Sequence, residues 1–459
     1  MYKASLSQVE DQDKFSRELA FEVFAWLIHA RRPMTALELQ HALAIEEGSK
    51  SLDRDVLISI DDLISMCGGL VTLNADSNLL SFIHVSVEDF FQNIRQERFA
   101  DGQKQIAVAS LTYLSFDCFK DGQCADAEKL QQRLEEYPFL DYAALFWGIH
   151  AGEVGASDIL GVAKGLLRHR GKVACCSQIM QARSHRSSLS GVSGSEAVTA
   201  LHLLAHFGLT DLSLLVSDFK DVNAEDSLGR DPMAWAVQSS QREMISLLLD
   251  KGADITAVDR KGRSHLALAA INGDIGVVER LLERGADPLT KDIRGQSILS
   301  LAAMNGKLSA LESITNRVPD NIDDRDKTGR TPLFYAAEKG HDDVVAYLTD
   351  QPLVDVNSQD EKGQTPLIAA ARKGHVKIIA VLLRHPRIVV NLRDSMGRTA
   401  LITATIEGHL DVLELLVTHT DGLAGLQIPD YTGRTPQAWA SIVNRPHVQE
   451  FLKSRTPPG

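Results

Sequence analysis

Residues 326–341 read DKTGRTPLFYAAEKGH, and two closely related stretches follow. They are DEKGQTPLIAAARKGH from residue 360 and DSMGRTALITATIEGH from residue 394. Asp-x-x-Gly forms a tight turn, because the carboxylate bonds to nearby backbone N–H groups and glycine accepts a positive φ. Threonine caps the next helix and proline fits its first position. Each stretch therefore predicts a turn and a short helix that ends at the second glycine.

The same turn recurs along the C-terminal half of the chain. An aspartate stands three positions before each turn glycine, and the glycines are 33 to 36 residues apart. An outer helix follows each short helix, with apolar stripes such as Val278-Leu281-Leu282. Helices this short are marginal alone, so stacking of neighbouring repeats has to stabilise them. The seven turn glycines are Gly229, Gly262, Gly295, Gly329, Gly363, Gly397 and Gly433.

This period and pattern resemble the ankyrin repeat. We count about eight repeats over residues 197–455, with first helices beginning near residues 199, 231, 264, 297, 331, 365, 399 and 435. Two repeats lack the glycine expected between their helices, where Ser240 and Asn444 stand instead. The second of these is the last repeat, which we expect to be a C-terminal cap.

The region before the repeats has a different pattern. Helical periodicity, a capping box at Thr35 and two short apolar segments around a polar stretch together indicate a winged-helix domain. The expected elements are helices from Phe15, over residues 35–44 and over residues 56–66, a hairpin of residues 70–73 and 79–85, and a helix from Ser86.

Short sequence motifs in this region show a more specific resemblance. They are FAWL at 24–27, RRPMT at 31–35, CGGLV at 67–71, HVS at 84–86 and YPFLDYA at 137–143, with Trp147 and His150. Over about residues 15–155 the sequence is similar to fungal NACHT–ankyrin proteins. That resemblance implies an intracellular sensor or scaffold, whose winged helix lies between an ATP-binding module and ankyrin repeats. The sequence has no P-loop, because Gly171-Lys172 is followed by Val173. We therefore expect the back half of such a protein, without its nucleotide switch.

Composition divides the chain into five segments, and the fold class is mainly α. Residues 184–196 are rich in serine and glycine, which predicts a flexible linker and a domain boundary. The segments are a polar N-terminal tail (1–14), a winged-helix domain (15–100), a helical extension (101–183), the linker (184–196) and the ankyrin array (197–455).

Charge and cysteine content exclude several classes of function. The 459 residues include 48 Lys and Arg against 61 Asp and Glu, a net charge of −13, which disfavours nucleic acid and anionic membranes as partners. The segment before the wing carries Asp53, Asp55, Asp61 and Asp62, so we do not expect it to enter a DNA groove. No apolar run approaches the ~18 residues of a membrane span. Five cysteines without a Cys-x-x-Cys pair indicate a reducing compartment. We expect a cytoplasmic location and leave a nuclear pool open.

No catalytic motif accompanies this pattern. His202 and His206 have the spacing of a metal pair, but His202 matches the repeat histidine that bonds to the backbone of the turns. The Cys175-Cys176 pair is a weak redox candidate, and a buried pair is the simpler interpretation. Neither a His-Glu-x-x-His nor a Gly-x-Ser-x-Gly motif occurs. The sequence thus predicts no enzyme, no cofactor, no metal site and no small-molecule substrate.

The remaining hypothesis is recognition of another protein. In ankyrin arrays, the turn tips and first helices line a concave surface. Trp235 and Tyr335 are unusual, amphipathic residues there and are our expected partner anchors. An apolar groove is expected from Leu268, Leu301, Phe207 and Met304. A basic ridge is expected from Arg230, Arg263, Arg294, Arg330 and Arg398, which favours an acidic or phosphorylated partner segment. Alternatively, these arginines only solvate the turns and pair with the turn aspartates.

Two functions follow from these expectations. The first is a non-enzymatic adaptor or scaffold that binds a partner through the concave ankyrin surface. The alternative is an orphan regulatory factor, either the partner of a NACHT-type sensor or a regulator of transcription or of a secondary-metabolite gene cluster.

Overall fold

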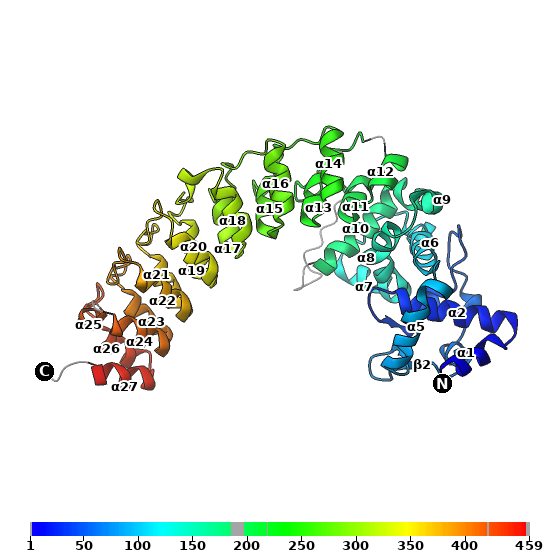
Figure 1. The fold of residues 1–459 in the computed structure, drawn as a ribbon, viewed down its shortest axis with the longest axis horizontal. Coiled ribbons are helices and arrows are strands. Elements are labelled where there is room, and N and C mark those ends of the chain that lie inside the picture. The colour runs from blue at the N-terminus through cyan, green and yellow to red at the C-terminus, as the bar shows by residue number, and fades with distance from the viewer. Residues whose placement is uncertain (1, 185–196, 218, 420–421, 456–459) are drawn as a thin grey trace. The chain divides into compact units, whose positions relative to one another are not determined.

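The chain forms two compact units in the computed structural model, which describes residues 2–184, 197–217, 219–419 and 422–455. The units are residues 1–253 and 254–459, and both are mainly helical (Figure 1). The first unit contains the winged-helix region, the helical extension and the first two ankyrin repeats. Nearly all of the expected linker lies outside the described residues, and the packing divides the chain after the second repeat instead.

The segment expected to be a polar tail is instead mostly helical. Helix α1 (Tyr2–Glu10) buries Leu6 and Val9 and packs against α2 (Lys14–His29). A Cβ placed on Gly68 would lie 2.8 Å from a methyl carbon of Val9, so this contact is close. The expectation of a tail was wrong because two apolar residues at helical spacing suffice to bury one face of a polar helix.

The winged-helix elements follow the sequence pattern, with two differences. Thr35 and Glu38 form the expected capping box. Strand β1 (Met34–Thr35) adds an unexpected edge to the hairpin, giving an antiparallel sheet of order β1-β3-β2. The expected helix over residues 56–66 begins only at Ile60, because Ser59 caps it. The elements are α3 (Ala36–Leu43), η1 (Arg54–Val56), α4 (Ile60–Met66), β2 (Val71–Leu73), β3 (Leu79–Phe82) and α5 (Val85–Arg98).

An aromatic core joins the winged helix to the helical extension. The Phe91 ring is fully buried, 4.7 Å from that of Phe24 and 4.8 Å from that of Phe82 between centroids. On the other side of α2, Trp26 meets Phe139 edge to face at 5.4 Å. The extension consists of α6 (Gly102–Leu114), η2 (Asp117–Phe119), α7 (Ala127–Glu136), α8 (Phe139–Gly152), α9 (Ala156–Leu167) and α10 (Arg170–Ser184).

The first ankyrin repeat packs directly on this extension. Helix α11 contacts α8 and α10, and α12 contacts α9. The Phe207 ring lies 5.1 Å from that of Trp147, against the bare backbone of Gly148. Phe207, expected in the apolar groove, is half-buried with its ring packed on α8, and its role in a groove stays a prediction. The helices of the first two repeats are α11 (Ala200–Phe207), α12 (Thr210–Val216), α13 (Pro232–Gln238) and α14 (Arg242–Asp250).

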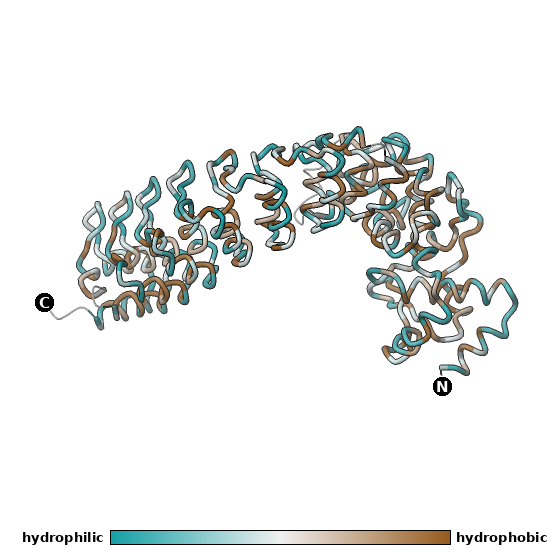
Figure 2. The backbone as a smooth tube through the Cα atoms, turned by 45° about the horizontal axis from the view of Figure 1, so that its top comes forward, coloured by the Kyte–Doolittle hydropathy of each residue, from teal (hydrophilic) through white to brown (hydrophobic). Residues whose placement is uncertain are grey.

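The second unit repeats one helix pair after another (Figure 1). Figure 2 shows the resulting alternation of hydrophobic helices and hydrophilic turns. The first helices begin within a residue or two of the expected positions. In both atypical repeats the expected glycine position keeps its left-handed backbone, with φ of 57° at Ser240 in the first unit and 51° at Asn444 here. The helices are α15 (His265–Asn272), α16 (Ile275–Glu283), α17 (Ile298–Met304), α18 (Leu308–Thr315), η4 (Pro319–Asn321), α19 (Pro332–Lys339), α20 (Asp342–Thr349), α21 (Pro366–Lys373), α22 (Val376–Arg384), α23 (Ala400–Glu407), α24 (Leu410–Thr418), α25 (Gly422–Gly425), α26 (Pro436–Ile442) and α27 (Pro446–Arg455).

Repeat histidines tie neighbouring repeats together in this unit. His341 Nε2 donates to the Met304 carbonyl at 2.9 Å, and His375 Nε2 to the Glu338 carbonyl at 3.2 Å. His409 does the same to the carbonyl of Arg372. Each bond satisfies a carbonyl at the end of the preceding inner helix, which otherwise lacks a partner. These three histidines therefore have a structural role.

The docking of the first repeat can be tested with two helical glycines. A Cβ on Gly148 would lie 2.1 Å from Phe207 Cγ, whereas one on Gly161 would meet no atom within 4 Å. We expect Gly148→Ala to destabilise the chain by ~1–3 kcal/mol through overpacking. Gly161→Ala, its matched control on α9, should be neutral or stabilising by up to ~1 kcal/mol. Equal urea midpoints for the two variants would contradict the docking.

The first unit also contains a buried histidine whose protonation is unfavourable. The Tyr142 hydroxyl donates to His150 Nε2 at 2.9 Å, and His150 Nδ1 donates to Gln103 Oε1 at 2.5 Å. Complete burial, and then the positive charge of Arg31, lower the pKa of His150 to about 3. The folded state therefore keeps this ring neutral.

The free energy of unfolding should therefore decrease as the pH is lowered. Because the folded pKa lies below the unfolded value of 6.5, the contribution of His150 is complete above pH 6.5 and is lost as the pH falls. Between pH 6.5 and pH 5 the loss amounts to about 2 kcal/mol. We expect urea denaturation to show a smaller loss between pH 7 and pH 5 for His150→Gln than for the wild type. An identical loss in both proteins would refute the role of His150.

Candidate functional site

The turn aspartates organise the most regular exposed surface of the ankyrin repeats. In all seven turns, Oδ1 of the aspartate accepts the backbone N–H groups two and four positions later, at 2.8–3.0 Å. The aspartate N–H donates to the carbonyl four positions later, and the glycine N–H returns to the aspartate carbonyl. These bonds fix the backbone of each turn from the aspartate to the residue four positions later.

A backbone ladder links successive turns in the second unit. Ile293 N–H donates to the Lys261 carbonyl at 3.0 Å, and Lys327 N–H donates to that of Arg294 at 3.0 Å. The same bond recurs in the next three turns, from Glu361, Ser395 and Tyr431. Glycine is required because a Cβ on Gly262 would lie 2.9 Å from the Ile293 nitrogen. The ladder therefore places the side chains of the turn tips along one edge.

Trp235 belongs to a closed cluster in the first unit. Its ring is 4% exposed, and its Nε1 donates to Asp226 Oδ2 at 3.0 Å. Arg230 bonds to the same oxygen and covers the ring at 5.2 Å. Burial raises the pKa of Asp226, but the Arg230 charge and the hydrogen bonds outweigh it, so the pKa lies below its usual range.

Tyr335 occupies the equivalent place in the second unit. It is 5% exposed, donates to Asp326 Oδ2 at 2.5 Å, and accepts from Gln296 Nε2 at 2.7 Å. Burial, and then the bond to Asp326, raise the pKa of Tyr335 to about 12. Both anchors expected from sequence thus have their polar atoms occupied by turn aspartates. Whether a partner touches them stays a prediction.

The other expected apolar groove residues differ in accessibility. Leu268 and Leu301 are buried, at 3% and 5% exposure. Met304 is half-buried, and its carbonyl receives the bond from His341. These leucines contribute mainly to packing between first helices.

In the expected basic ridge, four arginines contact acidic or aromatic side chains of the described residues, and one does not. Arg230 and Arg263 form ion pairs with the aspartates of their own turns, at 2.7 and 2.5 Å, as the alternative interpretation required. Arg330 reaches Asp360 of the next turn, and Arg398 lies over the Trp439 ring at 5.1 Å. Arg294 is exposed and forms no ion pair with the described residues. Cationic groups open to a partner are therefore fewer than the sequence suggests.

Sequence reasoning missed exposed apolar residues at the tips. Ile293 is 58% exposed, Met396 57% and Tyr431 67%. All follow a turn aspartate by one or two positions, where solvent-facing polar residues are usual. An apolar residue at such a position could therefore have indicated an exposed apolar contact from the sequence. Together with exposed cations at equivalent positions they form what we call the tip strip. Its members are Arg260, Lys261, Ile293, Arg294, Lys327, Lys362, Met396 and Tyr431.

Metal and membrane sites are not found in the described part of the chain. No group of three His, Cys, Asp or Glu side chains there could hold a metal ion. None of the helices described is both long and apolar enough to cross a bilayer. His202, the expected structural histidine, has its Nε2 3.0 Å from the Arg230 carbonyl.

Comparison with known proteins agrees with this architecture. The family model of ankyrin repeats (3 copies) matches residues 167–259, 265–360 and 351–430. A model described as the winged helix domain of GPI inositol-deacylase matches residues 9–101. No curated protein matches the chain. Since the ankyrin matches cover more than half of the 459 residues, the chain belongs to the ankyrin-repeat family, with a winged-helix domain preceding its repeats.

Proposed function

We propose that the protein is a non-enzymatic adaptor that binds a partner protein through the tip strip of its second unit. Ankyrin repeats imply protein–protein interaction, and the tip strip supplies what a specific contact needs. It combines exposed apolar side chains with cations that no carboxylate of the described residues neutralises. Its backbone is fixed by the ladder of turn bonds, so little ordering entropy is lost on binding.

The charge pattern favours a partner segment that is acidic or phosphorylated and carries apolar residues. The chain as a whole has a net charge of −13, so its overall field repels an acidic segment. Arg260, Lys261 and Arg294 give the tip strip the opposite sign over two neighbouring turns. Ile293 lies between these cations and offers an apolar contact. Cations around an apolar side chain favour partner segments with acidic groups flanking an apolar residue, and they fix where such a segment binds.

We further propose that the winged-helix region acts as a second protein platform, as the resemblance to fungal NACHT–ankyrin proteins implies. Helix α4 carries Asp61 and Asp62 in its first turn, which opposes insertion into a DNA groove. The charge of this element therefore gives no support to a regulator that binds DNA, whereas a partner of a NACHT-type sensor remains an alternative proposal.

We also propose that the protein is not an enzyme, and the burial of two cysteine thiols supports this. Cys175 and Cys176 are buried, and burial raises the pKa of the Cys175 thiol to about 11. Thiols in this state are poor nucleophiles at neutral pH.

Charge reversal on the tip strip tests the adaptor proposal. We expect Lys261→Glu with Arg294→Glu to weaken partner capture at least tenfold in a cross-linking pull-down, with an unchanged melting temperature. The matched control is Lys377→Glu with Arg384→Glu, which reverses two exposed charges on the outer helix α22. Capture by the tip-strip variant at the level of the control would refute the assignment.

A second variant distinguishes the tip strip from the buried aromatics. Tyr335→Phe removes the donor to Asp326 and leaves the ring in place. We expect it to lower stability by ~1–3 kcal/mol, because a buried acceptor loses its partner. Partner affinity of the folded variant should stay within twofold of the wild type. A large loss of affinity without loss of stability would instead support Tyr335 as a direct anchor.

A further inference from the structure

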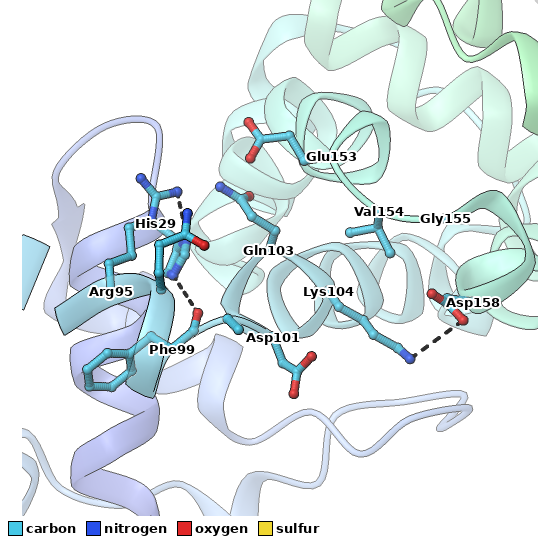
Figure 3. A pocket seen from close by; sticks show the side chains of 12 residues that line it. His29, Arg95, Phe99, Asp101, Gln103, Lys104, Glu153, Val154, Gly155 and Asp158 are labelled. Atoms are coloured by element: carbon cyan, nitrogen blue, oxygen red, sulfur yellow. Dashed lines mark hydrogen bonds and ion pairs between the residues drawn. The ribbon is translucent and has the colours of Figure 1, made fainter.

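A pocket of about 330 Å³ opens where the winged helix meets the helical extension. Residues of α2, α5, α6 and the turn between α8 and α9 line it. Figure 3 shows His29, Arg95 and Gln103 at one end, and Lys104 with Asp158 at the other. The pocket lies within the first unit and shares no residue with the tip strip, so its interpretation does not depend on the proposed adaptor function.

His29 fixes the direction of a cationic side chain at one end. His29 Nε2 lies 3.0 Å from the Phe99 carbonyl, which can only accept, so Nε2 carries the proton. Nδ1 is left as the acceptor for Arg95 Nη2, also at 3.0 Å. Burial, and then the Arg95 charge, lower the pKa of His29 to about 4, which keeps the ring neutral.

The Arg95 charge has no counterion among the described residues. Arg98, on the same helix, pairs with Glu10, and Lys104 approaches Asp158 at 3.9 Å. Arg95 bonds only to the neutral His29 ring. Its half-buried guanidinium is therefore oriented but not neutralised.

An unsatisfied donor accompanies this cation. Gln103 is 7% exposed, and its Oε1 accepts from His150 Nδ1, which fixes the orientation of the amide. The other amide atom, Nε2, is buried and has no hydrogen-bond partner in the part of the chain that the structure describes. Leaving a buried donor unpaired is unfavourable, so a ligand that supplies an acceptor recovers that free energy.

The remaining charges restrict which acceptor fits. Asp101, Glu153 and Asp158 also line the pocket, and Glu153 is engaged by Arg31. These carboxylates repel an anion in proportion to its charge, so a singly charged carboxylate beside Arg95 is opposed less than a doubly charged phosphate group. A carboxylate also matches the planar, two-pronged guanidinium.

We propose that this pocket binds a small carboxylate-bearing molecule, whose oxygens accept from the Arg95 guanidinium and the Gln103 amide. The volume is at the lower end for small-molecule sites, so the ligand is the size of a simple metabolite. The ligand is bound and not converted, which is compatible with the expected lack of a substrate. Bound between the winged helix and the extension, it stabilises their junction.

Propionate tests the proposal with the full chain. Saturation-transfer NMR titrations should show binding to the wild type, and Arg95→Gln should raise the dissociation constant at least tenfold. Gln103→Glu should do the same, because it replaces the donor with a carboxylate while keeping an acceptor for His150. The control is Arg98→Gln, which removes one positive charge from α5 outside this pocket and should change the constant less than twofold.

Competition on the wild type decides the ligand class even if a variant fails to fold. Neither inorganic phosphate nor putrescine should displace propionate at equal concentration. The proposal is overturned if propionate does not bind, if both folded variants bind it as the wild type does, or if phosphate or putrescine displaces it as readily as a second carboxylate does.

Discussion

The carboxylate of the turn aspartate is the interaction on which the repeats depend. One of its oxygens closes the turn by accepting two backbone N–H groups, and the glycine at the turn lets the next turn bond directly to this one. These carboxylates are largely removed from water, with Asp226 at 3% and Asp259 at 6% exposure. Burying a charge is unfavourable unless it is hydrogen-bonded, and the turn supplies those bonds. The result is a rigid series of tips, whose outward side chains can vary without disturbing the fold.

The second oxygen of the same carboxylate links structure to recognition. In some repeats it receives an arginine from its own turn, as at Asp259, and in others an aromatic donor, as at Asp326 and Asp430. An aromatic residue whose polar atom donates to the turn aspartate, such as Tyr335, therefore stabilises the turn whether or not a partner binds. The same requirement removes paired arginines from the recognition surface. What remains for a partner is set mainly by side chains directly after the aspartate, such as those of Lys261, Ile293 and Arg294, which make no bond to the turn aspartate.

Features that depend on local physics could be read from the sequence, and features that depend on distant contacts could not. The repeat period, the capping box at Thr35 and the hairpin around residues 74–78 follow from turn and cap chemistry, and the structure confirms them. The packing of Phe207 on Gly148 joins residues far apart in the chain and has no local signature. The same holds for the pocket beside Arg95, where the decisive facts are an absent counterion and an amide turned by His150. Pattern also could not show that Trp235 and Tyr335 bond to turn aspartates, because an amphipathic residue at a groove position looks the same whether or not a buried carboxylate engages it.

Locating the partner on the surface tests the central claim most directly. Lysine-reactive cross-linking of the full chain with its partner, read by mass spectrometry, can compare the tip lysines Lys261, Lys327 and Lys362 with exposed lysines elsewhere. Lys377 on α22 and Lys14 on α2 serve as the comparison. We expect cross-links to the partner to concentrate on the three tip lysines. Cross-links concentrated on Lys14 or Lys377, with the tip lysines unreacted, would contradict it.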